Sequence, residues 1–228
     1  MRKCNAMIMV FLLLTILSLC KASTLICHEK EKQALLSIKH ALTDPTNRLS
    51  SWSINEDCCG WTGVHCDSVF GWVVELHLGN WNDPSAIGPY GILSGEISPA
   101  LLELQFLSHL DLSYNDFGGT PIPSFLGSMQ SLTFLYLFNA SFGGVIPHQI
   151  GNLSSLRYLV LGCYAVSCEL YVDNFSWISL LSSLETLGLQ GIDLHKEVHW
   201  LEYLSVLPLL LGLSLVHYCQ LDNISPSL

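Results

Sequence analysis

The chain repeats one short hydrophobic pattern, a pair of leucines separated by a single residue, through much of its length. Alternation with a period of two predicts a short strand whose leucines point into a core and whose intervening residues point away from it. One unit cannot bury its own leucines, so we predict that successive units stack in register and share a continuous core. The pairs begin, at intervals of 24 to 28 residues, at Leu110, Leu135, Leu159, Leu187 and Leu213.

The stacked units predict an α/β solenoid with short parallel strands on one concave face. About five to six units fill residues 69–228, because Val74–Leu78 has the pattern of another strand and Leu93–Pro99 that of the tail of a degenerate unit. Two irregular stretches, Asn80–Gly91 and Tyr164–Leu180, interrupt the array, and we expect both to be loops that leave the solenoid. The array is expected to be uncapped at its C-terminal end.

Asn115 follows the first leucine pair, at the point where the chain must turn. An asparagine side chain can satisfy backbone groups of its own turn and of the neighbouring coil. The equivalent positions in the later units are Ala140, Tyr164, Ile192 and Tyr218. The later turns must therefore satisfy their backbone groups in another way.

Before the repeats, Glu29–Leu42 carries apolar residues at helical spacing, among them Leu35 and Ile38. Asp44 and Pro45 follow directly and stop the predicted helix. A stacked array needs a cover over the open end of its core. We therefore predict one amphipathic helix that serves as an N-terminal cap.

Residues 1–22 carry the pattern of a secretory signal peptide. Arg2 and Lys3 precede an apolar run from Ala6 to Leu19, and the small residue Ala22 follows. A membrane anchor is the alternative, but the run has 14 residues, whereas a spanning helix needs about 20. We therefore expect cleavage near Ala22 and a chain that folds in an oxidising compartment.

The charge of the mature chain argues against one class of partner. Three of the 9 Lys and Arg residues lie in residues 1–22, so 6 basic residues remain against 19 acidic ones, a net charge of −13. Nucleic-acid binding needs a basic footprint. We therefore exclude nucleic acid as a partner.

Together these features resemble the plant extracellular leucine-rich-repeat family. The cap of that family matches Cys27, Ala34–Lys39, Asp44–Pro45, Leu49–Trp52, Asp57–Cys59 and Trp61–Cys66. Its Gly-x-Ile-Pro signature is approached at Gly95–Ile97, Gly119–Pro123 and Gly144–Pro147. The resemblance implies a right-handed superhelix with a plant-type N-terminal cap over residues 23–68.

Three segments resemble receptor-like proteins of the Cf resistance and ethylene-inducing-xylanase-receptor type, namely Gly71–Leu76, Ser98–Leu102 and Tyr171–Asn174. This resemblance implies the N-terminal fragment of a ligand-recognition ectodomain in plant defence. Its ligand would be an extracellular protein, peptide or carbohydrate elicitor, and its partners membrane co-receptor kinases. The chain would be apoplastic as given, or at the plasma membrane if the full product has a C-terminal transmembrane helix. The alternatives are a secreted inhibitor similar to polygalacturonase-inhibiting proteins, and a truncated decoy or non-functional relic.

The family's cap implies two disulfide bonds, Cys27–Cys58 and Cys59–Cys66. Direct bonding of the adjacent Cys58 and Cys59 would be strained. A zinc site is the rival interpretation, but an oxidising compartment and the lack of paired Cys-x-x-Cys units disfavour it.

Outside the cap, two groups could carry chemistry, and a structural role is favoured for both. Cys163 and Cys168 can form a local bridge, which would leave Cys219 free. His195–His199 has two histidines four residues apart, but Lys196 replaces the glutamate that a zinc protease needs after its first histidine. No nucleophile elbow or phosphate loop occurs, so we expect no catalysis, no cofactor and no metal.

Candidate ligand contacts are the outward strand positions, because exposed aromatic side chains on a rigid sheet offer large contact area at little entropic cost. These positions are His109, Asp111, Ser113, Phe134, Tyr136, Phe138, Tyr158, Val160 and Gln190. The alternative is that Phe134, Phe138 and Val160 simply pack side by side.

Four asparagines stand in sequons for N-glycosylation, at Asn139, Asn152, Asn174 and Asn223. A sequon in a secreted protein predicts a glycan on a surface loop. A glycan on Asn139 would stand at the end of a strand and obstruct part of the candidate surface.

Overall fold

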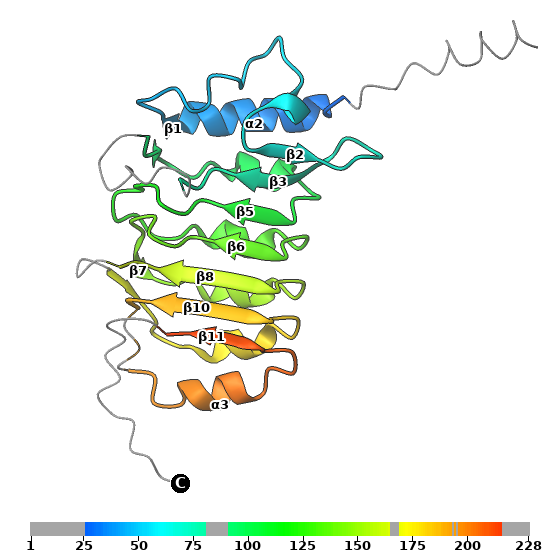
Figure 1. Cartoon of the computed structure of the whole chain (residues 1–228). Coiled ribbons are helices and arrows are strands. Elements are labelled where there is room, and N and C mark those ends of the chain that lie inside the picture. Colours follow the sequence, from blue (N-terminus) through cyan, green and yellow to red (C-terminus); the bar gives the residue numbers. More distant parts are fainter. Residues whose placement is uncertain (1–25, 81–90, 165–168, 193, 195, 216–228) are drawn as a thin grey trace, which may run out of the picture.

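The structure, a computed structural model, describes residues 26–80, 91–164, 169–192, 194 and 196–215. Its strands are stacked in one column, with helix α2 (Glu29–Ala41) at one end and helix α3 (Trp200–Ser205) at the other (Figure 1). The predicted signal peptide and most of the Asn80–Gly91 stretch lie outside the described residues. Within the described ranges, no helix is long and apolar enough to cross a membrane.

One seven-stranded sheet forms the body of the solenoid, in the order β11-β10-β8-β6-β5-β3-β2. All neighbours are parallel except β2 and β3, which are antiparallel. The prediction of a leucine-rich-repeat solenoid with parallel strands is confirmed. The strands are β2 (Val64–Cys66), β3 (Val73–His77), β5 (His109–Asp111), β6 (Phe134–Tyr136), β8 (Tyr158–Gly162), β10 (Thr186–Gln190) and β11 (Gly212–Ser214).

The leucines form a continuous row through the core. The first leucine of each pair lies directly opposite its counterpart on the neighbouring strand. Full burial of a leucine side chain stabilises a fold by about 1.5–3 kcal/mol relative to exposure, so this row favours stacking in register. Five of its members have no exposed surface: Leu76, Leu110, Leu135, Leu159 and Leu187.

Helix α2 covers the first end of this core. It ends at Ala41, one residue before the predicted boundary, and it buries Ala34, Leu35 and Ile38. These side chains share one face of the helix, which packs against the 3-10 helix η2 (Pro99–Glu103). The predicted amphipathic cap helix is therefore present.

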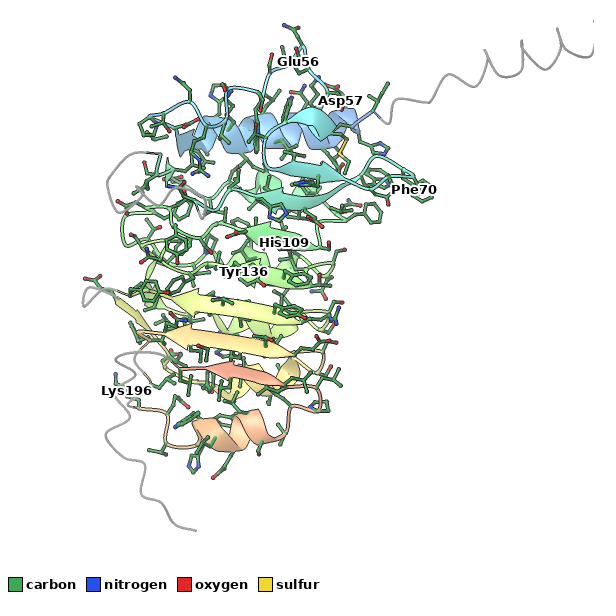
Figure 2. The ribbon with its side chains drawn as sticks, viewed as in Figure 1. Glu56, Asp57, Phe70, His109, Tyr136 and Lys196 are labelled. Atoms are coloured by element: carbon green, nitrogen blue, oxygen red, sulfur yellow. A yellow bond between two sulfur atoms is a disulfide. The ribbon has the colours of Figure 1, made fainter. Side chains whose placement is uncertain are left out.

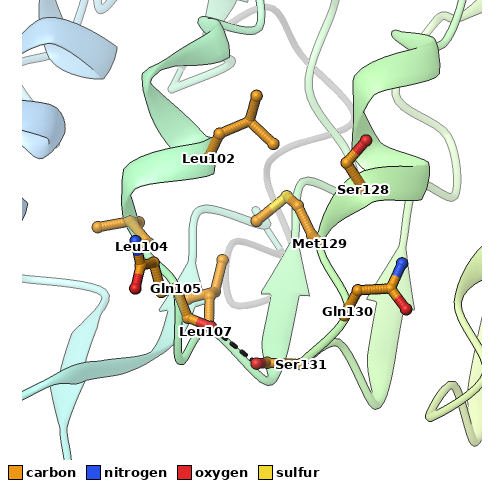
Figure 3. Close-up of a pocket in the computed structure, with 8 residues that line it drawn as sticks. All are labelled: Leu102, Leu104, Gln105, Leu107, Ser128, Met129, Gln130 and Ser131. Carbon is orange, nitrogen blue, oxygen red and sulfur yellow. Dashed lines mark hydrogen bonds between the residues drawn. The ribbon is translucent and has the colours of Figure 1, made fainter.

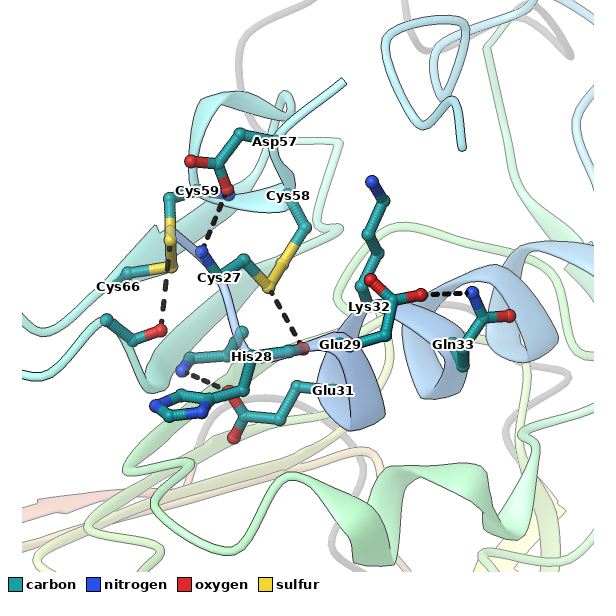
Figure 4. Close-up of a disulfide and its surroundings, with 12 residues drawn as sticks. Cys27, His28, Glu29, Glu31, Lys32, Gln33, Asp57, Cys58, Cys59 and Cys66 are labelled. Carbon is teal, nitrogen blue, oxygen red and sulfur yellow. Dashed lines mark hydrogen bonds between the residues drawn. A yellow bond between two sulfur atoms is a disulfide. The ribbon is translucent and has the colours of Figure 1, made fainter. Parts of the chain in front are cut away.

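Two disulfide bonds hold the cap together (Figure 4). Cys27 is bonded to Cys58 with a Cα–Cα distance of 5.5 Å, and Cys59 to Cys66 with one of 5.4 Å. Asp57 accepts hydrogen bonds through Oδ1 from the backbone amides of Cys27 (3.0 Å) and Cys59 (3.1 Å). The structure thus contains the pairing that the family resemblance implies.

Outside the cap, Cys163 is also disulfide-bonded. Its backbone amide donates to the Gln190 carbonyl at 2.8 Å, which ties the end of β8 to β10. Its predicted partner Cys168, and Cys219, lie outside the described residues, so the Cys163–Cys168 bridge stays a prediction.

Short 3-10 helices cover the side of the core that faces away from the sheet (Figure 1). After η2, they are η3 (Ser124–Ser128), η4 (His148–Asn152) and η5 (Ser176–Leu180). Two small two-stranded sheets lie between the main sheet and the 3-10 helices. One is antiparallel and pairs β1 (Leu42–Thr43) with β4 (Ser94–Gly95). The other is parallel and pairs β7 (Gly143–Val145) with β9 (Glu169–Tyr171).

The expectation that Tyr164–Leu180 leaves the solenoid as a loop was wrong for most of its length. Strand β9 and helix η5 lie within this segment and continue the stack. The physical reason is its apolar content, because Leu170 is 2% exposed and Phe175 0%. Their burial holds the segment against the core.

Asn115 joins the first repeat to the cap. Its Nδ2 donates to the carbonyls of Leu78 and Leu112, both at 2.9 Å. Its Oδ1 accepts from the Leu93 amide at 3.0 Å and from Arg48 Nη1 at 3.2 Å. The predicted role of this asparagine, to satisfy backbone groups in its own turn and the neighbouring coil, is confirmed.

We predict that Asn115→Ala destabilises the fold by roughly 2–4 kcal/mol, because the buried Leu93 amide loses its acceptor and the Leu112 carbonyl loses a donor. Urea denaturation followed by tryptophan fluorescence measures the change. The control is Asn55→Ala, which alters an exposed turn. Equal unfolding midpoints for the two variants would contradict the assigned role.

The close approach of successive 3-10 helices requires a glycine at position 127. A Cβ atom built on Gly127 would lie 2.1 Å from the Gln149 carbonyl oxygen in η4. This distance is much shorter than a van der Waals contact, so the two atoms would clash. We predict that Gly127→Ala costs about 1–3 kcal/mol of stability, as overpacking does. Gly60→Ala is the control, because a Cβ there meets no atom within 4 Å. Differential scanning calorimetry should show a lower Tm only for the Gly127 variant.

Candidate recognition surface

The residues that flank the buried leucines form two rows on the other face of the sheet, which we call the open face. The register places each residue of a row directly opposite its counterpart on the next strand. The first row is Glu75, His109, Phe134, Tyr158 and Thr186, and the second row is His77, Asp111, Tyr136, Val160 and Gly188. On the antiparallel strand β2, His65 lies opposite Glu75 and extends the first row.

Aromatic side chains contact one another along this face from β2 to β8. We call the set His65, His77, His109, Phe134, Tyr136 and Tyr158 the ring ladder. Its successive ring centroids are 5.1 Å apart for His65 and His77, 4.3 Å for His77 and His109, 5.0 Å for His109 and Phe134, and 4.4 Å for Phe134 and Tyr158. Such contacts restrict the rotation of each ring. Figure 2 shows His109 and Tyr136 side by side on this face.

Polar contacts fix the far end of the ring ladder. The Tyr158 hydroxyl donates to Glu185 Oε2 at 3.1 Å, and Arg157 Nε donates to Glu185 Oε1 at 2.7 Å. The Arg157 guanidinium carbon also lies 5.8 Å from the Tyr158 ring centroid. Tyr158 is thus held on its strand by an ion pair beside it.

Burial favours the neutral form of two groups in the middle of the open face. The pKa of His109 is lowered, first by desolvation and then by the neighbouring His77. The pKa of the Tyr136 hydroxyl is raised, again mainly by desolvation. Both groups are therefore neutral at neutral pH, and the centre of this face presents uncharged rings that can still form hydrogen bonds.

The structure brings four of the nine predicted contact residues together in the ring ladder on the open face, since Phe134 lies between His109 and Tyr158 and Tyr136 beside them. His109, Tyr136 and Tyr158 are half-buried members of the ring ladder. Asp111 and Phe138 were wrongly predicted to be exposed, since they are 7% and 2% exposed.

The two corrections have different physical causes. The Asp111 carboxylate turns back toward the chain and accepts a hydrogen bond from the Ser113 amide at 2.8 Å. Phe138 lies beyond the end of β6, where strand alternation no longer applies, and its ring packs edge-on against Tyr114 and Tyr164. Ser113 is buried as well.

Sequence reasoning missed the contribution of the two strands nearest the cap. Residues 74–78 were recognised as a strand, but Glu75 and His77 were not assigned to the open face, and β2 with His65 was not predicted. The signal was available in β3, because Glu75 and His77 flank a buried leucine as His109 and Asp111 do. The antiparallel placement of β2 had no such signal.

Two groups of described residues bring potential metal-ligand atoms within 4.8 Å of one another. The first is Cys27, Asp57, Cys58 and Cys59, but its three sulfur atoms are already in disulfide bonds. The second is His65, Glu75 and His77, at the cap end of the open face.

A small pocket lies on another side of the molecule, between η2 and η3 and the segments that follow them (Figure 3). Its volume is about 190 Å³, below the roughly 300–1,000 Å³ typical of small-molecule sites. Its lining combines leucines with Ser128, Met129 and Gln130 and contains no titratable side chain. The open face is therefore the stronger candidate site.

Comparison with known protein families agrees with this architecture. The family model for the leucine rich repeat N-terminal domain matches residues 28–67. The model for the leucine rich repeat matches residues 106–129 and 131–153. These ranges correspond to the cap and to the two units that the sequence shows as most regular.

Among curated relatives, the chain is 40% identical over 210 residues to the receptor-like protein EIX1 of Solanum lycopersicum. The match covers 89% of this chain and 20% of that protein. The chain is also 44% identical over 125 residues to the receptor-like protein EIX2 of the same species. This second match covers 54% of this chain and 12% of that protein. The chain thus spans about a fifth or less of the length of these relatives.

Among solved structures, the PEPR1–AtPEP1 complex is similar to this chain, with a TM-score of 0.64 and 26% identity over 82% of this chain and 24% of that one. The Arabidopsis receptor kinase HAESA in complex with the peptide hormone IDA and the co-receptor SERK1 is also similar, with a TM-score of 0.61 and 28% identity over 73% of this chain and 26% of that one. Fold, cap and sequence agree, and the chain therefore belongs to the leucine-rich-repeat proteins and is related within them to plant receptor-like proteins.

Proposed function

We propose that this chain is part of an extracellular recognition ectodomain that binds its ligand on the open face of the sheet. The observation that carries the proposal is the ring ladder, a set of exposed and half-exposed aromatic side chains held in register over four repeats and the cap. Pre-ordered rings lose little entropy on binding and contribute large contact areas. A surface of this kind is suited to ligand recognition rather than to catalysis.

The ligand class that the comparisons support is a peptide. One similar structure is named as a receptor kinase in complex with the peptide hormone IDA, and another as PEPR1–AtPEP1. The parallel rows of side chains offer an extended peptide repeated contacts along one direction. A protein or a carbohydrate elicitor would meet the same rings, and these remain the other candidate ligands.

Co-receptor kinases are the proposed partners. One similar structure contains the co-receptor SERK1 beside its receptor kinase and peptide. The relatives of this chain are named receptor-like proteins, which favours a receptor role over that of a polygalacturonase inhibitor. We place the ectodomain outside the cell, where the two cap disulfides are stable, and at the plasma membrane if the full product is anchored there.

We predict that Tyr136→Ala weakens ligand binding by more than about tenfold, because hot-spot residues are buried aromatic side chains near the centre of an interface. Biolayer interferometry of the secreted chain against an array of extracellular peptides and cell-wall oligosaccharides measures binding. Tyr171→Ala is the matched control, since it removes a tyrosine that is 38% exposed on β9, outside the main sheet.

Two results would refute the proposed surface. One is a ligand whose affinity is the same for the Tyr136 and Tyr171 variants. The other is the absence of any binding to the array by a folded wild-type chain.

Two of the three described sequons should carry glycans that leave the ring ladder accessible. Asn152 at the end of η4 and Asn174 just before η5 are exposed, on the side of the core away from the sheet. We predict N-glycosylation at both, to be checked by glycosidase digestion in heavy-oxygen water and mass spectrometry. Unmodified asparagine at both sites would contradict the prediction. Asn139 is half-buried beside the open face, and Asn223 lies outside the described residues.

A further inference from the structure

The backbone places four potential metal-binding side chains on one small area of the open face. His65 lies opposite Glu75 in the antiparallel pair of β2 and β3. His109 lies opposite Glu75 on the other side, in the parallel pair of β3 and β5. His77 is two residues after Glu75, and residues two apart on a strand point to the same face. Strand register alone therefore groups three imidazoles around one carboxylate.

The side chains of His65, Glu75 and His77 complete this grouping. A ring nitrogen of each histidine and a carboxylate oxygen of Glu75 all lie within 4.8 Å of one another. His77 Nε2 and Glu75 Oε2 form a hydrogen bond of 2.8 Å, which coordination of both groups to one metal ion would replace. Ligands of one tetrahedral zinc ion, each about 2.1 Å from it, lie about 3.4 Å apart. The set reaches such distances only when its side chains adjust on metal binding, and the exposed His65 ring has room to do so.

From this geometry we infer that His65, Glu75 and His77 bind a divalent transition-metal ion of the zinc class. Two imidazole nitrogens and one carboxylate oxygen form a donor set that zinc takes in proteins, with a further position left open. Imidazole donors favour zinc, copper or nickel over magnesium and calcium, which prefer oxygen ligands. The His109 ring lies against His77, with the ring centroids 4.3 Å apart and the ring planes tilted by 40°, and it limits the rotation of the His77 ring.

The site lies at the cap end of the ring ladder, which gives the bound metal a defined position relative to a ligand. The exposed fractions of the His77 and Glu75 side chains are 35% and 43%, so the metal can enter from solvent. The inference does not depend on the identity of the ligand and can be tested without one.

Isothermal titration of the secreted chain with zinc chloride tests the inference. We expect one zinc ion per chain, and at least about a tenfold loss of affinity in each of His65→Ala, Glu75→Gln and His77→Ala, since even the loss of an outer partner costs roughly 10–100-fold. His148→Ala is the matched control, because it removes an exposed histidine at the start of η4. The same titration with magnesium chloride should give no binding.

A second measurement separates loss of the site from loss of the fold. Zinc should raise the Tm of the wild-type chain and of the His148 variant, because a ligand that binds the folded state stabilises it. It should leave the Tm of the three site variants unchanged, although each of them melts cooperatively in zinc-free buffer. The inference is overturned if the wild-type chain does not bind zinc, or if the site variants bind it as tightly as the wild type.

Discussion

No single unit of this chain can bury its own leucines, and the rest of the structure depends on that constraint. Each leucine reaches full burial only when the next unit stacks against it in register. The same register aligns the residues beside the leucines, because side chains alternate strictly across a strand. The requirement that builds the core therefore also builds the two rows of the open face.

A stack held together by neighbour contacts needs a well-fixed first layer. Helix α2 covers the core there. One disulfide joins the residue range just before α2 to the segment that precedes β2, and the other joins that segment to β2 itself. A hydrogen bond between Arg48 and Asn115 ties this cap to the first repeat. Arg48 also donates to the carbonyls of Leu78 and Gly79 at 3.0 and 3.1 Å. These contacts satisfy backbone groups that an uncapped solenoid would leave buried without partners.

The open face differs in character along its length because its side chains change while its backbone does not. Near the cap it carries histidines around Glu75, in the centre it carries Phe134 and Tyr136, and at β10 the second row reaches Gly188, which has no side chain. Stacking requires only the leucines, so these positions are free to be specialised for binding. The proposed metal site and the proposed peptide surface are neighbouring parts of the same two rows.

The sequence by itself determined the solenoid, the cap helix and the role of Asn115, because periodic leucines and a turn asparagine have few alternative structures. It also placed His109, Tyr136 and Tyr158 on the open face. Only the tertiary structure decided that Phe138 and Asp111 turn inward, that β9 and η5 continue the stack, and that His65 joins Glu75 and His77. Alternation holds only within a strand, whereas those features depend on where strands end and on an antiparallel pairing that local periodicity does not encode.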